Sequence, residues 1–163
     1  MNVRKKTLQF RRKREGKTDY NKRLNLLKSG LPRLVVRRSL RNIRAQLVEY
    51  HPQGDRILLT VDVHHLVKGY GLKHVRCNTT TAYLVGLLIG KRAVAKKIKQ
   101  AILDIGLQHP VKNGIIFAAV KGAVDAGMQI PHGEEILPDD KRIKGEHLKE
   151  SEFELVKMKV MKE

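Results

Sequence analysis

Apolar and polar side chains alternate along residues 33–63, as they do in half-buried β-strands. Two segments interrupt the alternation, a short connection at 40–42 and the turn sequence HPQGD at 51–55. The pattern therefore predicts an antiparallel meander of three strands, at 33–39, 43–50 and 56–63. Two apolar rows are expected to share the buried face, and they are Ile43, Ala45 and Leu47 on the second strand and Ile57, Leu59, Val61 and Val63 on the third.

The apolar period changes to that of a helix after Asn78. Residues 78–98 begin with cap-forming side chains and end with basic ones, as the helix dipole favours. The short apolar run at 101–107 fits a strand covered on both faces, and 113–127 fits a second amphipathic helix. Residues 129–145 show no periodicity and predict a loop. A charged amphipathic helix, roughly 146–162, is expected to follow.

The first seventeen residues have few apolar positions and predict an extended arm without a core of its own. A helix is expected to follow, with Thr18 as its N-cap and Asp19 in its first turn. Tyr20, Leu24 and Leu27 form one apolar stripe on it, which we expect to pack on the protein and leave a basic face exposed.

The predicted order is arm, helix, three strands, helix, strand, helix, loop, helix. This order describes an α/β fold with a mixed sheet and helices on its faces, and it resembles the ribonuclease-H-like layout of a three-strand antiparallel meander followed by α-β-α. We divide the chain into a basic N-terminal arm and helix (1–30), an α/β domain (31–130) and a charged loop and C-terminal helix that pack on the same domain (131–163).

Charge points to the partner of this domain. The net charge is +18, from 34 basic and 16 acidic residues, and such self-repulsion is usually tolerated because a polyanion neutralises it. The single cysteine, Cys77, excludes an internal disulfide and fits a reducing compartment. The longest apolar run, at 82–90, is far shorter than the ~20 residues of a membrane span, and no secretory signal is visible. We therefore expect a soluble, cytoplasmic protein.

The candidate catalytic and metal-binding residues give little support for an enzyme. A ribonuclease-H-like nuclease needs carboxylates that converge on two metal ions, but the first strand contains no acid, and Asp62 and Asp104 are expected to be surface carboxylates. His74 and Cys77 have ligand spacing without the second pair that zinc requires. We predict no catalysis, cofactor, metal or small-molecule substrate. A metal-dependent nuclease on the same fold is the main alternative, and a polybasic membrane-surface protein is a weaker one.

Nucleic acid explains the basic residues better. Aromatic residues make up 4% of the chain and tryptophan is absent, so recognition by shape and phosphate backbone is favoured over base stacking on the sheet. The cations of the arm, the first helix and the first hairpin are the candidates. Those chosen on charge alone are Arg4, Lys5, Lys6, Arg41 and Arg44.

Four ordered segments resemble the archaeal and eukaryotic branch of large-subunit ribosomal protein eighteen, a universal family that binds 5S rRNA. They are RRKREGKTDYNKRLNLLKSGLPRLVVRRS (11–39), NTTTAYLVGLLIGKRA (78–93), AILDIGL (101–107) and IPHGEEILPDDKRIKGEH (130–147), and the resemblance spans roughly 4–150. It implies a non-catalytic constituent of the large subunit that holds 5S rRNA against the large rRNA and neighbouring proteins in the central protuberance.

In that family the basic N-terminal segment and the first strand carry much of the 5S rRNA contact. The matching positions here are Arg11, Arg12, Lys13, Arg14, Lys17, Lys22, Arg23, Arg33, Arg37, Arg38 and Ser39. One departure follows that serine, where the family often has Asn-Lys-His and this chain has Leu40, Arg41 and Asn42. The resemblance therefore carries no base contact over to the hairpin tip, while Arg41 is still a candidate for a phosphate.

Overall fold

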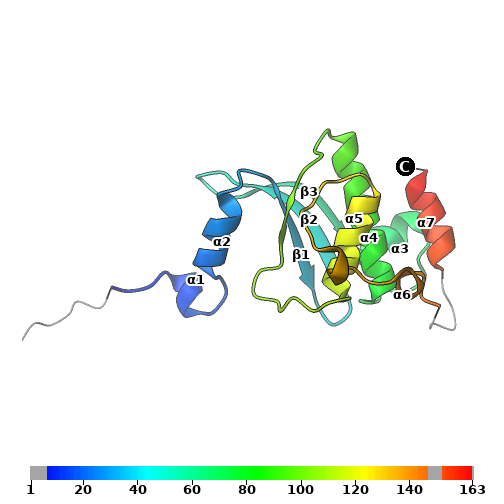
Figure 1. Ribbon diagram of the computed structural model, residues 1–163, viewed down its shortest axis with the longest axis horizontal. Helices are drawn as coiled ribbons and strands as arrows, with labels where there is room; N and C mark the ends of the chain where they lie inside the picture. Colours follow the sequence, from blue (N-terminus) through cyan, green and yellow to red (C-terminus); the bar gives the residue numbers. More distant parts are fainter. Residues whose placement is uncertain (1–6, 147–151, 163) are drawn as a thin grey trace, which may run out of the picture.

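The structure is a computed structural model that describes residues 7–146 and 152–162 (Figure 1). A four-stranded mixed sheet in the order β3–β2–β1–β4 lies at its centre. The first three strands form the predicted antiparallel meander, and the fourth pairs parallel with β1. The strands are β1 (Arg33–Arg38), β2 (Ile43–Glu49), β3 (Arg56–Asp62) and β4 (Ile102–Asp104). The expectation of an α/β fold with a mixed sheet is confirmed.

Helices cover one face of this sheet (Figure 1). The longest, α4 (Thr79–Ala95), packs against β2, β3 and α5 (Ile115–Asp125), and it is buried almost all round. The remaining elements on this side are α3 (Val63–Tyr70), the short 3₁₀ helix η1 (Glu134–Ile136), α6 (Asp140–Lys144) and α7 (Phe153–Met161). The inward row of β2 (Ile43, Ala45 and Leu47) is fully buried, as the alternation predicts.

Two glycines set the distance between α4 and α5. A Cβ on Gly86 would lie 1.9 Å from the carbonyl oxygen of Ala119, and one on Gly122 would lie 2.1 Å from that of Tyr83. Both separations are far below contact distance, so the helices approach backbone to backbone, and only glycine fits at these positions.

The N-terminal segment lies on the opposite side of the sheet from these helices. It contains a single helical turn, α1 (Arg11–Arg14), and the helix α2 (Tyr20–Leu27), which stands apart from the sheet in Figure 1. The prediction of an arm without helix is therefore wrong at α1. The N-cap of α2 is Asp19 and not Thr18, because the Asp19 carboxylate accepts hydrogen bonds from the backbone N–H groups of Asn21 and Lys22.

The apolar stripe of α2 is only partly covered. Leu24 is 56% exposed and no residue of α2 is fully buried. Tyr20 is half-buried, and its ring contacts that of Phe10 at a centroid distance of 5.3 Å. The prediction that the stripe packs on the protein is therefore confirmed only in part, since Tyr20 and Leu27 are half-buried and Leu24 is exposed. Ion pairs described below also connect α2 to the sheet.

The outer strand also departs from the predicted pattern. Leu47 pairs with Leu59 but Val48 pairs with Ile57, so a β-bulge adds one residue to β3. The extra residue reverses the phase of the alternation, and Ile57 faces away from the helices with 55% of its surface exposed. Ile57 therefore lies beside Val48 on the outer face and not with Val61 in the core.

Three further helical segments, α3, η1 and α6, were not predicted. Residues 63–70 continue from β3 as α3, because a capping box starts the helix: the Asp62 carboxylate accepts from the His65 N–H, and His65 Nδ1 accepts from the Asp62 N–H at 3.2 Å. The expected loop at 129–145 contains η1 and α6. The predicted C-terminal helix is present as α7, and its expected first turn extends into 147–151, outside the described residues.

Candidate nucleic-acid interface

The structure distributes the predicted RNA-binding residues over the N-terminal segment and the first hairpin. Arg4, Lys5 and Lys6 lie outside the described residues. The others are placed as follows: Arg11, Arg12, Lys13 and Arg14 on α1, Lys17 in the connection to α2, Lys22 and Arg23 on α2, Arg33, Arg37 and Arg38 on β1, Ser39 and Arg41 in the turn, and Arg44 on β2.

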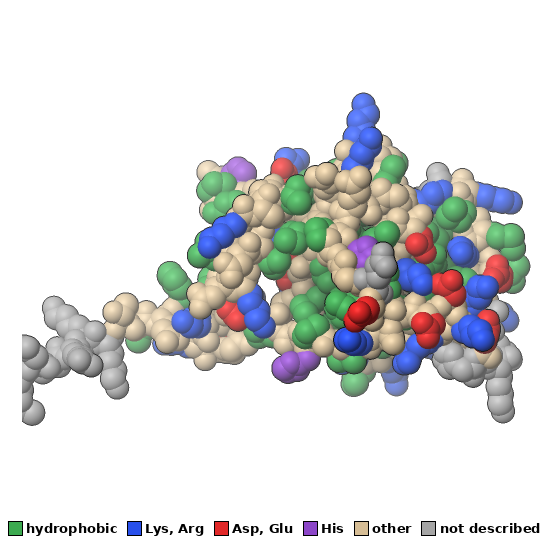
Figure 2. All heavy atoms as spheres, viewed as in Figure 1, with side chains coloured by type: hydrophobic (Ala, Val, Ile, Leu, Met, Phe, Trp, Pro, Cys, Tyr) green, Lys and Arg blue, Asp and Glu red, His purple; other side chains and the backbone are tan. Residues whose placement is uncertain are grey.

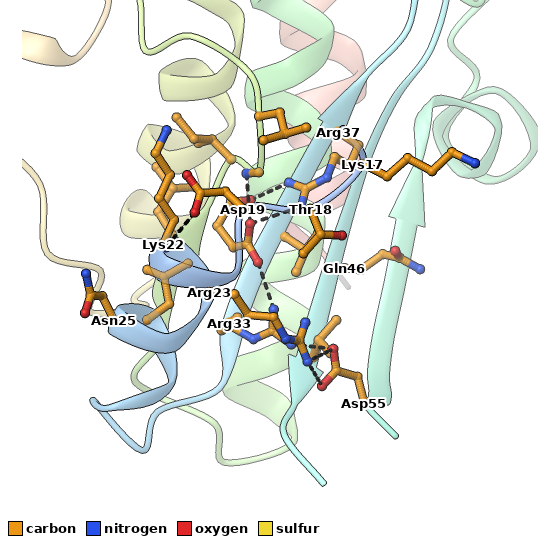
Figure 3. A pocket seen from close by; sticks show the side chains of 18 of the residues that line it. Lys17, Thr18, Asp19, Lys22, Arg23, Asn25, Arg33, Arg37, Gln46 and Asp55 are labelled. Atoms are coloured by element: carbon orange, nitrogen blue, oxygen red, sulfur yellow. Dashed lines mark hydrogen bonds and ion pairs between the residues drawn. The ribbon is translucent and has the colours of Figure 1, made fainter. Parts of the chain in front are cut away.

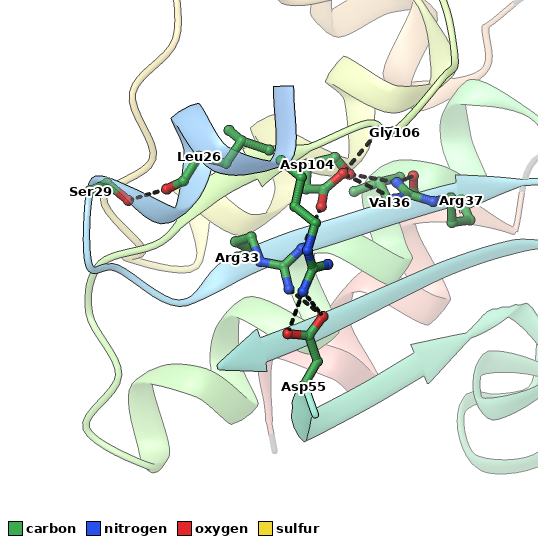
Figure 4. Close-up of polar contacts among 9 residues, drawn as sticks. Leu26, Ser29, Arg33, Val36, Arg37, Asp55, Asp104 and Gly106 are labelled. Carbon is green, nitrogen blue, oxygen red and sulfur yellow. Dashed lines mark hydrogen bonds and ion pairs between the residues drawn. The ribbon is translucent and has the colours of Figure 1, made fainter. Parts of the chain in front are cut away.

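Arg33 occupies a different environment from the expected one. It is 2% exposed, its Nη1 donates to Asp104 Oδ2 at 2.8 Å, and its Nη2 donates to Asp55 Oδ2 at 2.6 Å (Figure 4). Both ends of the guanidinium are occupied by protein carboxylates. We therefore remove Arg33 from the residues expected to contact phosphate and regard it as the centre of a buried network that positions its neighbours.

Asp55, in the turn before β3, joins this network to α2. Arg23 Nη2 donates to both Asp55 oxygens, at 2.8 and 2.9 Å, so one carboxylate links a helix residue to a strand residue. Burial alone would raise the pKa of Asp55, but hydrogen bonds from Arg23 and Arg33 hold it below its ordinary value. The carboxylate is therefore ionised at neutral pH, and it fixes α2 over the outer face of the sheet.

Asp104 fixes the other side of the network. Arg37 donates from Nη2 to Asp104 Oδ1 at 3.0 Å and from Nη1 to the Asp104 carbonyl at 2.7 Å. The N–H of Gly106 donates to the same carboxylate at 2.9 Å. Burial opposes ionisation of Asp104, but Arg37, Gly106 and Arg33 together hold its pKa below the usual aspartate range. Arg37 is thereby held in one orientation while its side chain is still 43% exposed.

A second group of cations is not neutralised in this way. The side chains of its members are exposed and have no hydrogen bond or ion pair within the part of the chain that the structure describes; these residues are Lys13, Arg14, Lys22, Arg38 and Arg41. Arg12 donates from Nε to Thr18 at 2.9 Å, and Arg11 and Lys17 both pair with Glu15. Figure 2 shows basic side chains on the N-terminal segment, and also over α6 and α7, where acidic side chains accompany them.

Hydrogen bonds order the turn between β1 and β2, beside which two of these cations lie. The Ser39 N–H donates to the Asn42 carbonyl at 2.7 Å, and the Asn42 N–H donates to Ser39 Oγ at 3.0 Å. Asn42 Oδ1 also accepts from the N–H of Val63, which ties the turn to the start of α3. Arg38 and Arg41 are thus held at the end of an ordered hairpin.

A cavity of about 760 Å³ separates α2 from the outer face of the sheet (Figure 3). Residues of α1, α2 and the connection between them form one wall, and residues of the four strands and of the segment after β4 form the other. Six basic and three acidic side chains line it, beside apolar side chains of the sheet. The charge and shape of this surface suit an anionic ligand that also has an apolar part.

A comparison with known proteins identifies the family. The family described as ribosomal large subunit proteins 60S L5 and 50S L18 matches residues 4–99 and 95–133. The large ribosomal subunit protein uL18 of Caldivirga maquilingensis is 50% identical over 162 residues, which cover 95% of this chain and 78% of the relative. The chain belongs to this family of large-subunit ribosomal proteins. The resemblance inferred from the four sequence segments is therefore confirmed.

Because the chain belongs to a family of large-subunit ribosomal proteins, the polyanion that neutralises its positive charge is rRNA. Family membership also favours a structural role over the nuclease alternative. The prediction of surface carboxylates at Asp62 and Asp104 is wrong, since both are buried, but each is occupied by protein donors. Among the described residues no cluster of three or more His, Cys, Asp or Glu side chains could hold a metal ion, and no helix there is long and apolar enough to span a bilayer.

Proposed function

We propose that this chain binds 5S rRNA in the large ribosomal subunit and helps to attach it to the large rRNA in the central protuberance, without catalysis. The observation that carries the proposal is the set of exposed, unpaired cations on α1, α2 and the hairpin turn. Each phosphate contact made by such a cation releases condensed counterions, so binding is strong and depends steeply on salt.

The proposed mechanism divides the basic residues into two roles. Lys13, Arg14, Lys22, Arg38 and Arg41 contact phosphates directly, and Arg23, Arg33 and Arg37 hold the frame on which those cations are displayed. The carboxylates of that frame prevent the arginines from repelling one another when RNA is absent. We infer that the surface is largely arranged before binding, which reduces the ordering cost of association.

We further propose that the meander and the α-β-α segment form a ribonuclease-H-like arrangement. In this proposal the first thirty residues are a basic extension, and residues 31–130 are the RNA-binding domain. Packing of α7 on α3 and α4 supports treating residues 131–163 as part of that same domain. The protein would act in the cytoplasm on the ribosome, beside neighbouring ribosomal proteins.

Binding to purified 5S rRNA at physiological salt tests the proposal, with tRNA of similar length as the competitor. A clear preference for 5S rRNA is expected, and equal affinity for both RNAs contradicts the proposal. Deleting residues 1–17 is expected to weaken binding and to flatten the plot of log affinity against log salt, because about five or more phosphate contacts are lost. An unchanged slope would show that the arm does not contact phosphate.

A further inference from the structure

The cavity between α2 and the sheet has an apolar floor in an otherwise basic surface. Val35 of β1, Val48 of β2 and Ile57 of β3 line it from three adjacent strands, and Val48 pairs directly with Ile57. The β-bulge described above turns Ile57 toward this side. A branched aliphatic side chain left 55% exposed among cations leaves apolar surface that a ligand could cover.

The rim of the cavity supplies positive charge and amide groups. The Lys22 ammonium is without a protein partner among the described residues, and the Arg12 side chain uses only its Nε, in the bond to Thr18. Gln46 donates from Nε2 to Thr60 at 3.2 Å, which leaves its carbonyl oxygen free to accept, and Asn25 lies across the cavity on α2. Lys22 and Asn25 line the cavity from α2, and Gln46 lines it from the sheet (Figure 3).

Arg37 adds a flat surface to the same cavity. Asp104 and the carbonyl of Val36 hold its guanidinium in one plane, and Gly106 lies so close to it that a Cβ there would be 2.8 Å from Nη2. Arginine planes held in this way are stacking partners for unpaired bases in RNA complexes.

We propose that the cavity takes one unpaired nucleotide of the bound RNA. The base covers the Val35–Val48–Ile57 floor and stacks on Arg37, Gln46 and Asn25 face its polar edge, and Lys22 and Arg12 meet the adjoining phosphates. A volume of about 760 Å³ lies within the range of small-ligand sites and cannot enclose a double helix. The inference rests on the proposed RNA-binding function and adds base recognition to it.

The first test compares Ile57→Ala with Val111→Ala, an apolar truncation outside the cavity at a residue that is 63% exposed. With 5S rRNA, Ile57→Ala is expected to bind about 5- to 10-fold more weakly at every salt concentration, because apolar surface that the base covers is lost while the phosphate contacts are kept. Chemical probing of base edges should show one or two unpaired bases that the unaltered chain protects and Ile57→Ala does not. Equal affinity and an equal footprint for Ile57→Ala and the unaltered chain would overturn the proposal.

The second test does not depend on 5S rRNA. Ribonucleoside 5′-monophosphates are titrated into the full chain while the methyl resonances of Val35, Val48 and Ile57 are followed by NMR. Shifts confined to these methyl groups are expected, and they should weaken in Gln46→Ala. Absence of shifts, or shifts caused by an acidic peptide and not by nucleotides, overturns the nucleotide site. A failure of 5S rRNA binding alone would instead refute the proposed function and leave this titration to decide on the cavity.

Discussion

Asp104→Asn tests whether the buried network holds the interface together. The substitution keeps the shape of the side chain and an oxygen for the Gly106 N–H, but it removes the charge that compensates Arg33 and Arg37. Breaking a buried ion pair by neutralising one partner costs about 3–5 kcal/mol. Arg33 keeps Asp55 as a second carboxylate, so we expect a loss near the lower end, about 3 kcal/mol.

Urea unfolding followed by circular dichroism measures this loss. With a slope of about 2 kcal/mol per molar urea, the midpoint should fall by about 1.5 M. Asp140→Asn is the matched control, because Asp140 also pairs with a cation, Lys121, but its side chain is 76% exposed. That control should change stability by less than about 1 kcal/mol. If both variants lose the same small amount, the network does not stabilise the fold and the reasoning fails.

The pH dependence of the Asp104→Asn effect gives an independent check. The pKa of Asp104 is lower in the folded chain than in the unfolded one, so its stabilisation is fully present above the unfolded value and is lost as pH falls through the folded value. The difference between the unaltered chain and Asp104→Asn should therefore be constant above about pH 5 and should shrink below about pH 4. A difference that grows on acidification would contradict the assigned direction.

Three further changes test separate parts of the structure. Gly86→Ala should destabilise the fold by about 3 kcal/mol or more through its collision with α5, whereas Gly69→Ala, in open space on α3, should be neutral or stabilising in the same unfolding assay. Arg23→Gln should raise amide hydrogen exchange in α2 without altering exchange in the core strands, and unchanged exchange in α2 would show that Asp55 does not hold the helix. Lys22→Ala should lower the salt slope of RNA binding by about one, and Lys99→Ala, an exposed unpaired lysine elsewhere, should not.

The sequence predicted the elements whose burial follows a regular period. The meander, α4 and α5 were found because alternation and helical spacing reflect contact with one core, and these are the elements that build it. α6 was missed because it is short and its one buried residue, Ile143, makes no period. α3 was missed because its capping box uses His65 in place of the usual Glu or Gln, so the strand pattern seemed to continue through Val63.

The candidate interface could be predicted in location but not in detail. Arg33 lies 22 residues from Asp55 and 71 from Asp104 in the sequence. No local sequence pattern therefore indicates that these two carboxylates neutralise its charge. The bulge that exposes Ile57 likewise depends on pairing across two strands. A signal for the network was present, since Asp104 is the single acid in an apolar run, and a buried carboxylate needs a cation. Pairing of the strands was required to identify that cation.

The all-round burial of α4 has a consequence for how the chain folds. Its faces are covered by the sheet, by α5 and by α7, which come from segments on both sides of it in the sequence. In a chain ending before residue 115, the face of α4 that carries Gly86 would lack α5, its packing partner. The exposed apolar surface of α4 would then favour self-association. The strands and α4 therefore cannot form a stable structure before α5 has been synthesised. We expect β1 through α5 to fold as one cooperative unit, late in synthesis, after the basic arm has long been available to RNA.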